Sequence, residues 1–175
     1  MCMLIDANLI PVVFSSRNSR HAEYKCLLEW FLYGKPKIVI GGYFFTKEIA
    51  ISLKSYLPLF TEFSKLNKVH KIDDAAIQQL TEEINSSENN PDFDDPHLLA
   101  LLVLSKAKLY CSEDERSYRF VKDKKFYPDG CNPPKILTFA HHSSCLDLLS
   151  DENICGIGIH KPLPKKIADL LFERI

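Results

Sequence analysis

This 175-residue sequence lacks a long apolar run and any excess of positive charge. No apolar run approaches the roughly 18 residues needed to cross a bilayer, so we expect no membrane partner. The formal net charge is −1 and the isoelectric point is about 6.6. Contact with a nucleic acid would therefore depend on a local basic patch, because the chain as a whole carries no attractive field.

The six cysteines contain no C-x-x-C pair. Residues 1–14 are apolar, but they lack the basic start of a secretion signal and include Asp6. We therefore expect a cytoplasmic protein whose cysteines are reduced thiols. A structural zinc site, which pairs its ligands two to four residues apart, is the alternative. Its ligands would be drawn from Cys131, His141, His142, Cys145, Cys155 and His160.

Motifs of several common catalytic and phosphate-binding sites are absent as well. The sequence contains no G-x-S-x-G, no G-x-x-x-x-G-K, no G-x-G-x-x-G and no H-E-x-x-H. The Gly41-Gly42 pair lacks the lysine that follows the glycines of a phosphate loop. We interpret this pair as a turn between a strand and a helix.

Short apolar runs alternate with segments of helical periodicity, which favours an α/β fold. This alternation is typical of a parallel sheet covered by helices on both faces. No repeat or linker divides the chain, so we expect one domain over residues 1–175. The expected strands are 3–5, 38–40, 109–111, 136–139 and 154–159, with a minor edge strand at 68–72. The expected helices are 19–33 with Ser19 as its cap, 46–63 with a break near Pro58, 73–84, 96–105, 143–149 and 167–175.

Four acidic residues stand where a predicted strand ends or a predicted helix begins, namely Asp6, Glu48, Asp95 and Asp114. Parallel sheets place ligand sites at the edge where their strands end. Carboxylates gathered there would repel one another unless a hard cation such as Mg²⁺ or Mn²⁺ neutralised them. The sequence therefore indicates a candidate metal site.

Neighbouring acids leave two of these four positions open to another assignment. Asp95 is preceded by Asp94, so the acid that opens the helix could be displaced by one residue. Asp114 lies between Glu113 and Glu115, which makes the last of the four ligands the least constrained.

The order and spacing of these motifs resemble the PIN domain family over nearly the whole chain. The motifs are Asp6-x-Asn8 after a strand, Glu48 in the helix after the second strand, Asp95-x-x-Leu98-x-Ala100, and Ser112-Glu113-Asp114 after a strand. The resemblance implies a three-layer α/β/α sandwich with a central, mostly parallel sheet, and a nuclease site that holds one or two divalent metals. By motif, Asp6, Glu48, Asp95 and Asp114 match the acidic quartet, while Asn8 and Ser112 match polar residues that assist catalysis. No family role matches His97, which is either a donor behind the ligands or a surface histidine.

A basic and aromatic segment follows the last acid. Residues 116–127 combine four aromatic side chains with Arg116, Arg119, Lys122, Lys124 and Lys125. Such mixtures suit single-stranded nucleic acids, where phosphates contact cations and bases stack on rings. The alternative is a solvated loop whose aromatic side chains face the core.

The sequence thus leads to one main hypothesis and two rivals. The main hypothesis is a PIN-like endoribonuclease that uses Mg²⁺ or Mn²⁺ to hydrolyse single-stranded RNA. Its resemblance to toxins of toxin–antitoxin pairs and to defence nucleases implies an inhibitory protein partner and leaves homo-oligomer formation open. The rivals are a DNA or structure-specific nuclease, and a non-catalytic PIN-like module that binds nucleic acid or protein.

Overall fold

A five-stranded, entirely parallel sheet forms the centre of the computed structural model, which describes residues 2–88, 90–138, 146–153 and 161–175. The strand order is β3-β2-β1-β4-β5. The strands are β1 (Cys2–Ile5), β2 (Lys37–Ile40), β3 (Val69–Lys71), β4 (Leu109–Cys111) and β5 (Lys135–Leu137). All residues of the central β1 and β4 are buried, as expected for parallel strands that are covered on both faces.

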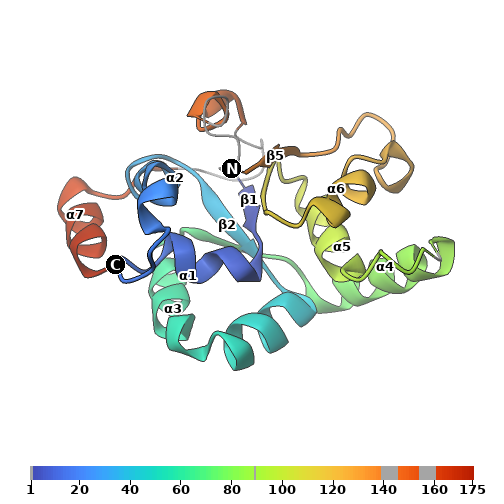
Figure 1. Ribbon diagram of the computed structural model, residues 1–175, viewed down its shortest axis with the longest axis horizontal. Helices are drawn as coiled ribbons and strands as arrows, with labels where there is room; N and C mark the ends of the chain where they lie inside the picture. Colours follow the sequence, from blue (N-terminus) through green and yellow to red (C-terminus); the bar gives the residue numbers. More distant parts are fainter. Residues whose placement is uncertain (1, 89, 139–145, 154–160) are drawn as a thin grey trace.

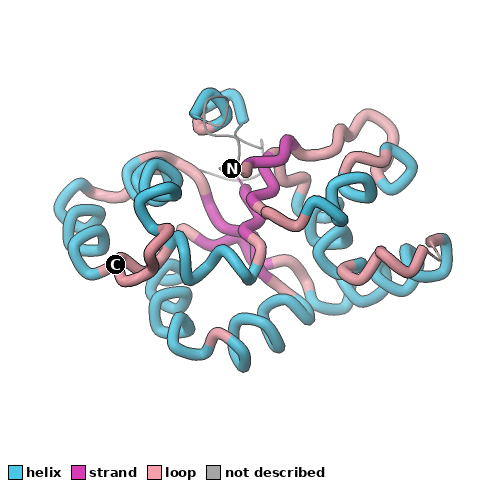
Figure 2. The backbone as a smooth tube through the Cα atoms, viewed as in Figure 1, coloured by secondary structure: helices cyan, strands magenta, loops and turns pink. Residues whose placement is uncertain are grey.

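Helices lie on both faces of this sheet. Figure 1 shows α1, α2, α3 and α7 on one side of the strands and α4, α5 and α6 on the other. The three-layer α/β/α sandwich is therefore confirmed, and Figure 2 shows the strands enclosed between the helical layers. The helices are α1 (Ile10–Val13), α2 (His21–Tyr33), α3 (Leu57–Lys65), α4 (Asp74–Ser87), α5 (Pro96–Ser105), α6 (Glu115–Val121) and α7 (Lys165–Arg174).

Shorter or wider helical turns connect these elements. The turns are η1 (Ala7–Leu9), η2 (Phe44–Ser52), η3 (Lys54–Tyr56), η4 (Lys124–Phe126), η5 (Leu146–Leu148) and η6 (Asp151–Asn153). Most are 3₁₀ turns, but η2 is a π-helix. The predicted helix 46–63 is interrupted, as expected, but the break lies over 53–56, and Pro58 itself lies in the first turn of α3, where a missing N–H costs little.

Helix caps account for several element boundaries. Asp73 caps α4 by accepting a hydrogen bond from the Ala76 backbone N–H. The predicted cap at Ser19 was wrong, because α2 begins at His21 and Arg20 occupies its cap position without a side-chain bond.

Two apolar groups pack against the two faces of the sheet. Helix α5 is buried almost throughout, which explains its apolar sequence on all sides. On the opposite face, four phenylalanine rings lie 4.9–6.1 Å apart in mostly edge-to-face contacts, which stabilise this layer beyond their burial. These rings are Phe14, Phe31, Phe60 and Phe63.

The strand order creates a switch point between β1 and β4. From β1 the chain adds β2 and β3 on one side, and then returns to add β4 and β5 on the other. Connections leave β1 and β4 in opposite directions, so a crevice opens at the carboxyl ends of these two strands. Asp6 directly follows β1 and Ser112 directly follows β4.

Some predicted elements lie outside the described residues. The strand at 154–159 does so entirely, and only Leu146–Leu148 of the helix 143–149 is assigned, as a 3₁₀ turn. Strand β5 replaces the predicted 136–139, of which residue 139 is not described. Among the described residues, every helix is too short or too polar to cross a membrane.

Candidate metal centre

A serine hydroxyl links the acids that follow β1 and β4. Ser112 Oγ donates a 2.7 Å hydrogen bond to Asp6 Oδ2 and accepts one of 3.0 Å from the Asp114 backbone N–H. The other Asp6 oxygen, Oδ1, accepts a 3.1 Å bond from the backbone N–H of Asn8. Asp6 and Asp114 therefore share one edge of the sheet, and a buried hydroxyl orients Asp6.

Glu48 reaches the same edge from the π-helix η2. The Leu53 backbone N–H bonds to the Glu48 carbonyl at 2.9 Å, the wide spacing that defines this turn and that recurs at functional sites in proteins. The Glu48 side chain meets His97, with Oε1 and Nε2 2.6 Å apart. His97 is buried, so the prediction of a surface histidine was wrong and that of a donor behind an acid fits its position.

Asp95 connects two groups of possible ligand atoms. In the first group, single atoms of Glu48, Asp95 and His97 all lie within 4.8 Å of one another. In the second, the same holds for Asp94, Asp95 and Asp114. Ligand atoms this close can share one cation or two neighbouring ones.

A cavity of about 420 Å³ brings the acids from β1, η2 and α5 together. Its lining includes Asp6, Asn8, Glu48 and Asp95, whereas Asp94 is exposed and does not line it. Of the two neighbouring aspartates, Asp95 is thus the one that shares a cavity with Asp6 and Glu48. Asp114 is joined to this group through Ser112 and Asp95 rather than by lining the cavity itself.

Burial and mutual repulsion act on these carboxyl groups. Burial raises the pKa of Asp95 to about 6; His97 opposes the rise, and Asp94, Glu48 and Asp6 add to it. The pKa of Asp6 is also raised, chiefly by burial, against the hydrogen bonds from Ser112 and Asn8 that favour its charged form. Negative charge is therefore costly here in the metal-free protein, and a bound cation would relieve that cost.

The acids next to Asp114 have other partners. Both carboxylate oxygens of Glu113 accept bonds from Arg20, at 2.7 and 2.5 Å, and the Tyr24 hydroxyl donates to Oε1 at 2.5 Å. Glu115 is exposed in the first turn of α6. Asp114 is therefore the member of this acidic triplet that lies beside Asp94 and Asp95.

Arg116 lies over the outer part of the acidic group. Its Nε is 3.0 Å from Asp114 Oδ1, and its Nη2 is 3.3 Å from Asp94 Oδ2. The side chain is 64% exposed, so it has room to leave these acids. This residue was predicted to contact nucleic acid, but here its partners are two carboxylates.

Two more of the predicted nucleic-acid contacts hold the loop before α5. Arg119 Nη2 bonds to Asp92 at 2.6 Å and to Asn90 at 3.2 Å, and Lys125 Nζ bonds to Glu88 at 2.8 Å. Lys122 and Lys124 are exposed, and within the described residues no ion pair involves them. The basic segment thus combines paired cations with two that face solvent.

The aromatic side chains of this segment pack inward. Phe120 is buried, and Phe93 contacts the rings of Phe120 and Phe126 at 4.6 and 6.0 Å between centroids. The hydroxyls of Tyr118 and Tyr127 donate to backbone carbonyls of Ser112 and Val121. These contacts correspond to the alternative in which the aromatics face the core.

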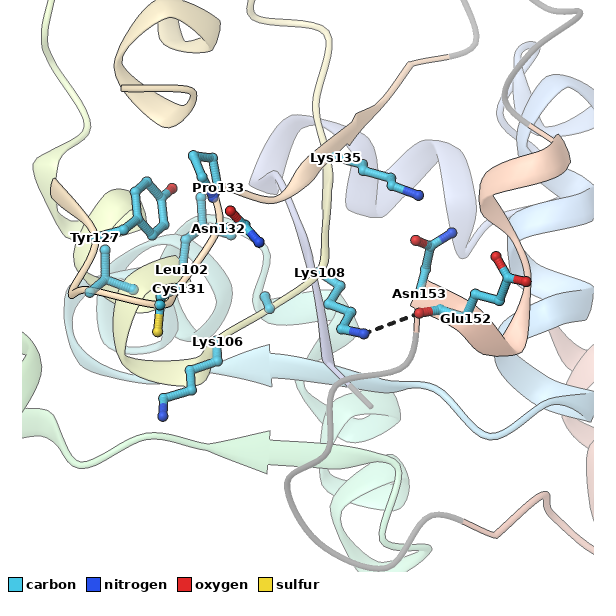
Figure 3. Close-up of a pocket in the computed structure, with 13 residues that line it drawn as sticks. Leu102, Lys106, Lys108, Tyr127, Cys131, Asn132, Pro133, Lys135, Glu152 and Asn153 are labelled. Atoms are coloured by element: carbon cyan, nitrogen blue, oxygen red, sulfur yellow. Dashed lines mark hydrogen bonds between the residues drawn. The ribbon is translucent and has the colours of Figure 1, made fainter. Parts of the chain in front are cut away.

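A larger cavity, of about 590 Å³, lies at the opposite edge of the sheet. Figure 3 shows it beside the starts of β4 and β5, with Lys108 donating to the Glu152 carbonyl at 3.1 Å. Its lining combines Lys106, Lys108 and Lys135 with apolar side chains and contains only one acid, Glu152. It therefore lacks the carboxylates that a site for Mg²⁺ needs.

The proposed zinc ligands cannot be assembled from the described residues. His141, His142, Cys145, Cys155 and His160 lie outside them, and Cys131, which is described, is a free, half-buried thiol.

No protein-family model matches the chain, and no curated protein matches it. The candidate site therefore depends on its own geometry. Its donors are mainly carboxylate oxygens, which suit Mg²⁺ or Mn²⁺, and the imidazole of His97 is the single nitrogen donor in the two ligand groups.

Proposed function

We propose that this protein is a PIN-like, metal-dependent nuclease that hydrolyses phosphodiester bonds of single-stranded RNA. One observation carries the proposal: Asp6, Glu48 and Asp95 line one cavity at the switch point of a parallel sheet. Asp114 lies next to them through its contacts with Ser112 and Asp95. Three elements distant in sequence thereby supply acids to a single place.

The donor set fits Mg²⁺ or Mn²⁺, with Asp6, Glu48, Asp95 and Asp114 as the residues that would hold it. When bound, such an ion supplies an activated water and a positive charge beside the phosphate. Ser112 and the Asn8 backbone hold the Asp6 carboxylate in one orientation. His97 does the same for Glu48. The Asn8 side chain lines the cavity, where it can orient water or phosphate.

The biological role that we propose is that of a toxin or defence nuclease. Its activity would then be restrained by an inhibitory protein partner that covers the acidic cavity. The same metal chemistry could serve DNA, and only contacts to the 2′-hydroxyl distinguish the two sugars.

A non-catalytic PIN-like module is the second candidate, and the position of Arg116 favours it. Its guanidinium neutralises Asp114 and Asp94, two carboxylates of the outer ligand group. A cation supplied by the chain itself could stabilise the acids without any metal. Metal binding and cleavage therefore have to be tested together.

The test combines Mn²⁺ titration by calorimetry with cleavage of a labelled single-stranded RNA in Mg²⁺, Mn²⁺ or EDTA. We expect cleavage only with metal. We expect Asp6→Asn and Asp95→Asn to lower the cleavage rate by at least about 100-fold. Mutation of residues that only orient the metal ligands already lowers metal affinity or activity by about 10–100-fold. Glu115→Gln, which changes an exposed acid beside Asp114, is the matched control and should retain activity.

Thermal unfolding of the same variants in EDTA separates loss of chemistry from loss of fold. Asp6→Asn removes a buried charge that repels its neighbours, so the metal-free variant should unfold at the wild-type temperature or above it. Cleavage that persists in EDTA, or in both asparagine variants, would reject the metal-dependent mechanism.

A further inference from the structure

An exposed aromatic ring stands directly beside the candidate metal centre. Tyr43 is 56% exposed and precedes η2, the element that carries Glu48. Its ring packs edge-on against His97, with centroids 5.0 Å apart, and His97 contacts Glu48 in turn. One face of the tyrosine is therefore held in place while much of the side chain faces solvent.

A cavity of about 430 Å³ opens beside Tyr43, between η2 and α4. Its size lies within the roughly 300–1,000 Å³ typical of small-ligand sites. The floor is Ile77, which approaches Gly42 so closely that a Cβ there would lie 2.9 Å from the isoleucine side chain. Gly42 also has a φ of +53°, so this wall of the cavity requires glycine.

This cavity is continuous with the acidic one. Tyr43, Thr81 and His97 line it and also line a second hollow of similar volume that includes Glu48 and Asp95. Glu48 and Asp95 line the cavity of Asp6 in turn. A path thus leads from the carboxylates, past His97, to the face of Tyr43.

The polar groups around Tyr43 are mainly hydrogen-bond acceptors. The hydroxyls of Thr46 and Thr81 donate their protons to the carbonyls of Gly42 and Ile77, at 2.9 and 2.7 Å, and so present only lone pairs to the cavity. The carboxylate of Glu82 only accepts, and the amide of Gln78 donates to it at 3.0 Å. The lining therefore favours a ligand that brings donors of its own.

We propose that this cavity binds one unpaired nucleobase that carries an exocyclic amino group, stacked on Tyr43, while the adjoining phosphate lies at the acidic centre. The inference rests on the proposed nuclease function, because the path between the two cavities gives the base its position. Stacking is available to every base, but the acceptors distinguish among them. Adenine and cytosine offer an amino group, whereas uracil and hypoxanthine offer a carbonyl at that place.

The experiment measures nucleoside binding without metal, by NMR titration of the full chain with adenosine and with purine riboside. These two ligands differ at one position, where the amino group is replaced by a hydrogen atom. We expect adenosine to bind about tenfold more tightly, since a hydrogen bond to a charged group is worth about 1.5–3 kcal/mol and 1.4 kcal/mol is tenfold.

Variants of Tyr43 test the stacking. Base–aromatic stacking is worth about 1–3 kcal/mol per base, so Tyr43→Ala should weaken adenosine binding about tenfold or more, and Tyr43→Phe should retain it. Tyr33→Ala, at an exposed tyrosine at the end of α2, is the matched control. In cleavage assays Tyr43→Ala should raise KM for single-stranded RNA while kcat stays close to the wild-type value.

The outcomes separate the two proposals. If adenosine binds in a Tyr43-dependent way and no cleavage occurs with Mn²⁺, the base site stands and the nuclease function fails. If cleavage occurs but adenosine and purine riboside bind alike, or Tyr43→Ala binds as tightly as the wild type, the base site is overturned and the nuclease function stands.

Discussion

Arg116 has two competing roles in this protein. In the metal-free state its guanidinium offsets the repulsion between Asp114 and Asp94. A divalent cation at the same carboxylates would displace it, and the freed side chain would then be available to a phosphate. An exposed arginine can make this exchange at small cost, because ion pairs at the protein surface contribute little to stability.

We therefore expect Arg116→Gln to bind Mn²⁺ more tightly than the wild type, by about fivefold at most, because the variant loses a competing surface ion pair. Binding of single-stranded RNA should weaken in the same variant. Calorimetric titration with Mn²⁺ measures the first effect, and Arg17→Gln, at another exposed arginine, is the control. Weaker Mn²⁺ binding by Arg116→Gln would mean that the arginine holds Asp114 in the geometry that the metal needs.

Some residues of the candidate site could be predicted from the sequence, and others could not. The aspartates could be found because each directly follows a strand or opens a helix, positions that a pattern reveals. The sequence could not decide between the two alternatives for His97, and it did not reveal Tyr43. Both positions depend on the π-turn of η2, which turns Glu48 toward His97 and leaves Tyr43 exposed. A π-helix pairs residues five apart, and the nine residues of η2 are too few for that spacing to show as a periodic pattern in the sequence.

At the scale of elements, the basic segment serves two purposes. Arg119 and Lys125 tie α6 and η4 to the loop of Glu88 and Asp92, which leads to Asp95. Lys122 and Lys124 are exposed, and no ion pair involves them among the described residues. The first pair supports the position of the acids, and the second pair is available to a ligand.

Neutralising the two exposed lysines should therefore change nucleic-acid binding alone. For Lys122→Gln with Lys124→Gln, we expect the slope of log affinity against log salt for single-stranded RNA to fall by about 1.4, or about 0.7 per phosphate contact. The matched variant, Arg119→Gln with Lys125→Gln, should lower the unfolding temperature instead. Filter binding at several salt concentrations, beside thermal unfolding, separates the two, and an unchanged slope would exclude the lysines as phosphate contacts.

Helices and strands could be predicted where burial determines the sequence pattern. They were harder to predict where local backbone geometry determines the structure. The central strands are apolar throughout because both faces are covered, so β1, β2 and β4 could be located from composition. A break was expected near Pro58, but its position over Leu53 to Tyr56 could not be found, because these residues continue the apolar spacing of the helices on either side. The aromatics of residues 116–127 were ambiguous for a similar reason: the sequence does not say which way a ring in a short helix faces.

The molecule places its clustered acids and a buried lysine at opposite ends of the strands of the sheet. The acids lie beyond the carboxyl ends of β1 and β4. Lys68 lies at the other end, just before β3, where its carbonyl accepts the Ile38 N–H. Lys68 is buried, its Nζ donates to the Gly34 carbonyl at 3.1 Å, and the same atom lies 4.7 Å from the centre of the Phe31 ring.

Lys68 should make the stability of the protein depend on pH between 7 and 9. Burial, with a smaller repulsion from Lys37, lowers the pKa of Lys68 in the folded protein to about 7, whereas an unfolded lysine titrates near 10.4. Between these values the unfolded chain binds more protons than the native one, so the free energy of unfolding rises with pH. We expect a rise of about 2 kcal/mol from pH 7 to pH 9, at about 1.4 kcal/mol per unit.

Lys68→Met keeps a flexible apolar chain in the same space and removes the charge, so this variant should be more stable than the wild type at pH 7 and should lose the rise. Urea unfolding at pH 7, 8 and 9 measures both effects, and Lys65→Met, at an exposed lysine of α3, is the control. Other groups that titrate in this range contribute equally to both proteins and cancel in the difference. Parallel stability curves for wild type and Lys68→Met would mean that Lys68 stays charged in the folded protein, held by the Gly34 carbonyl and the face of Phe31.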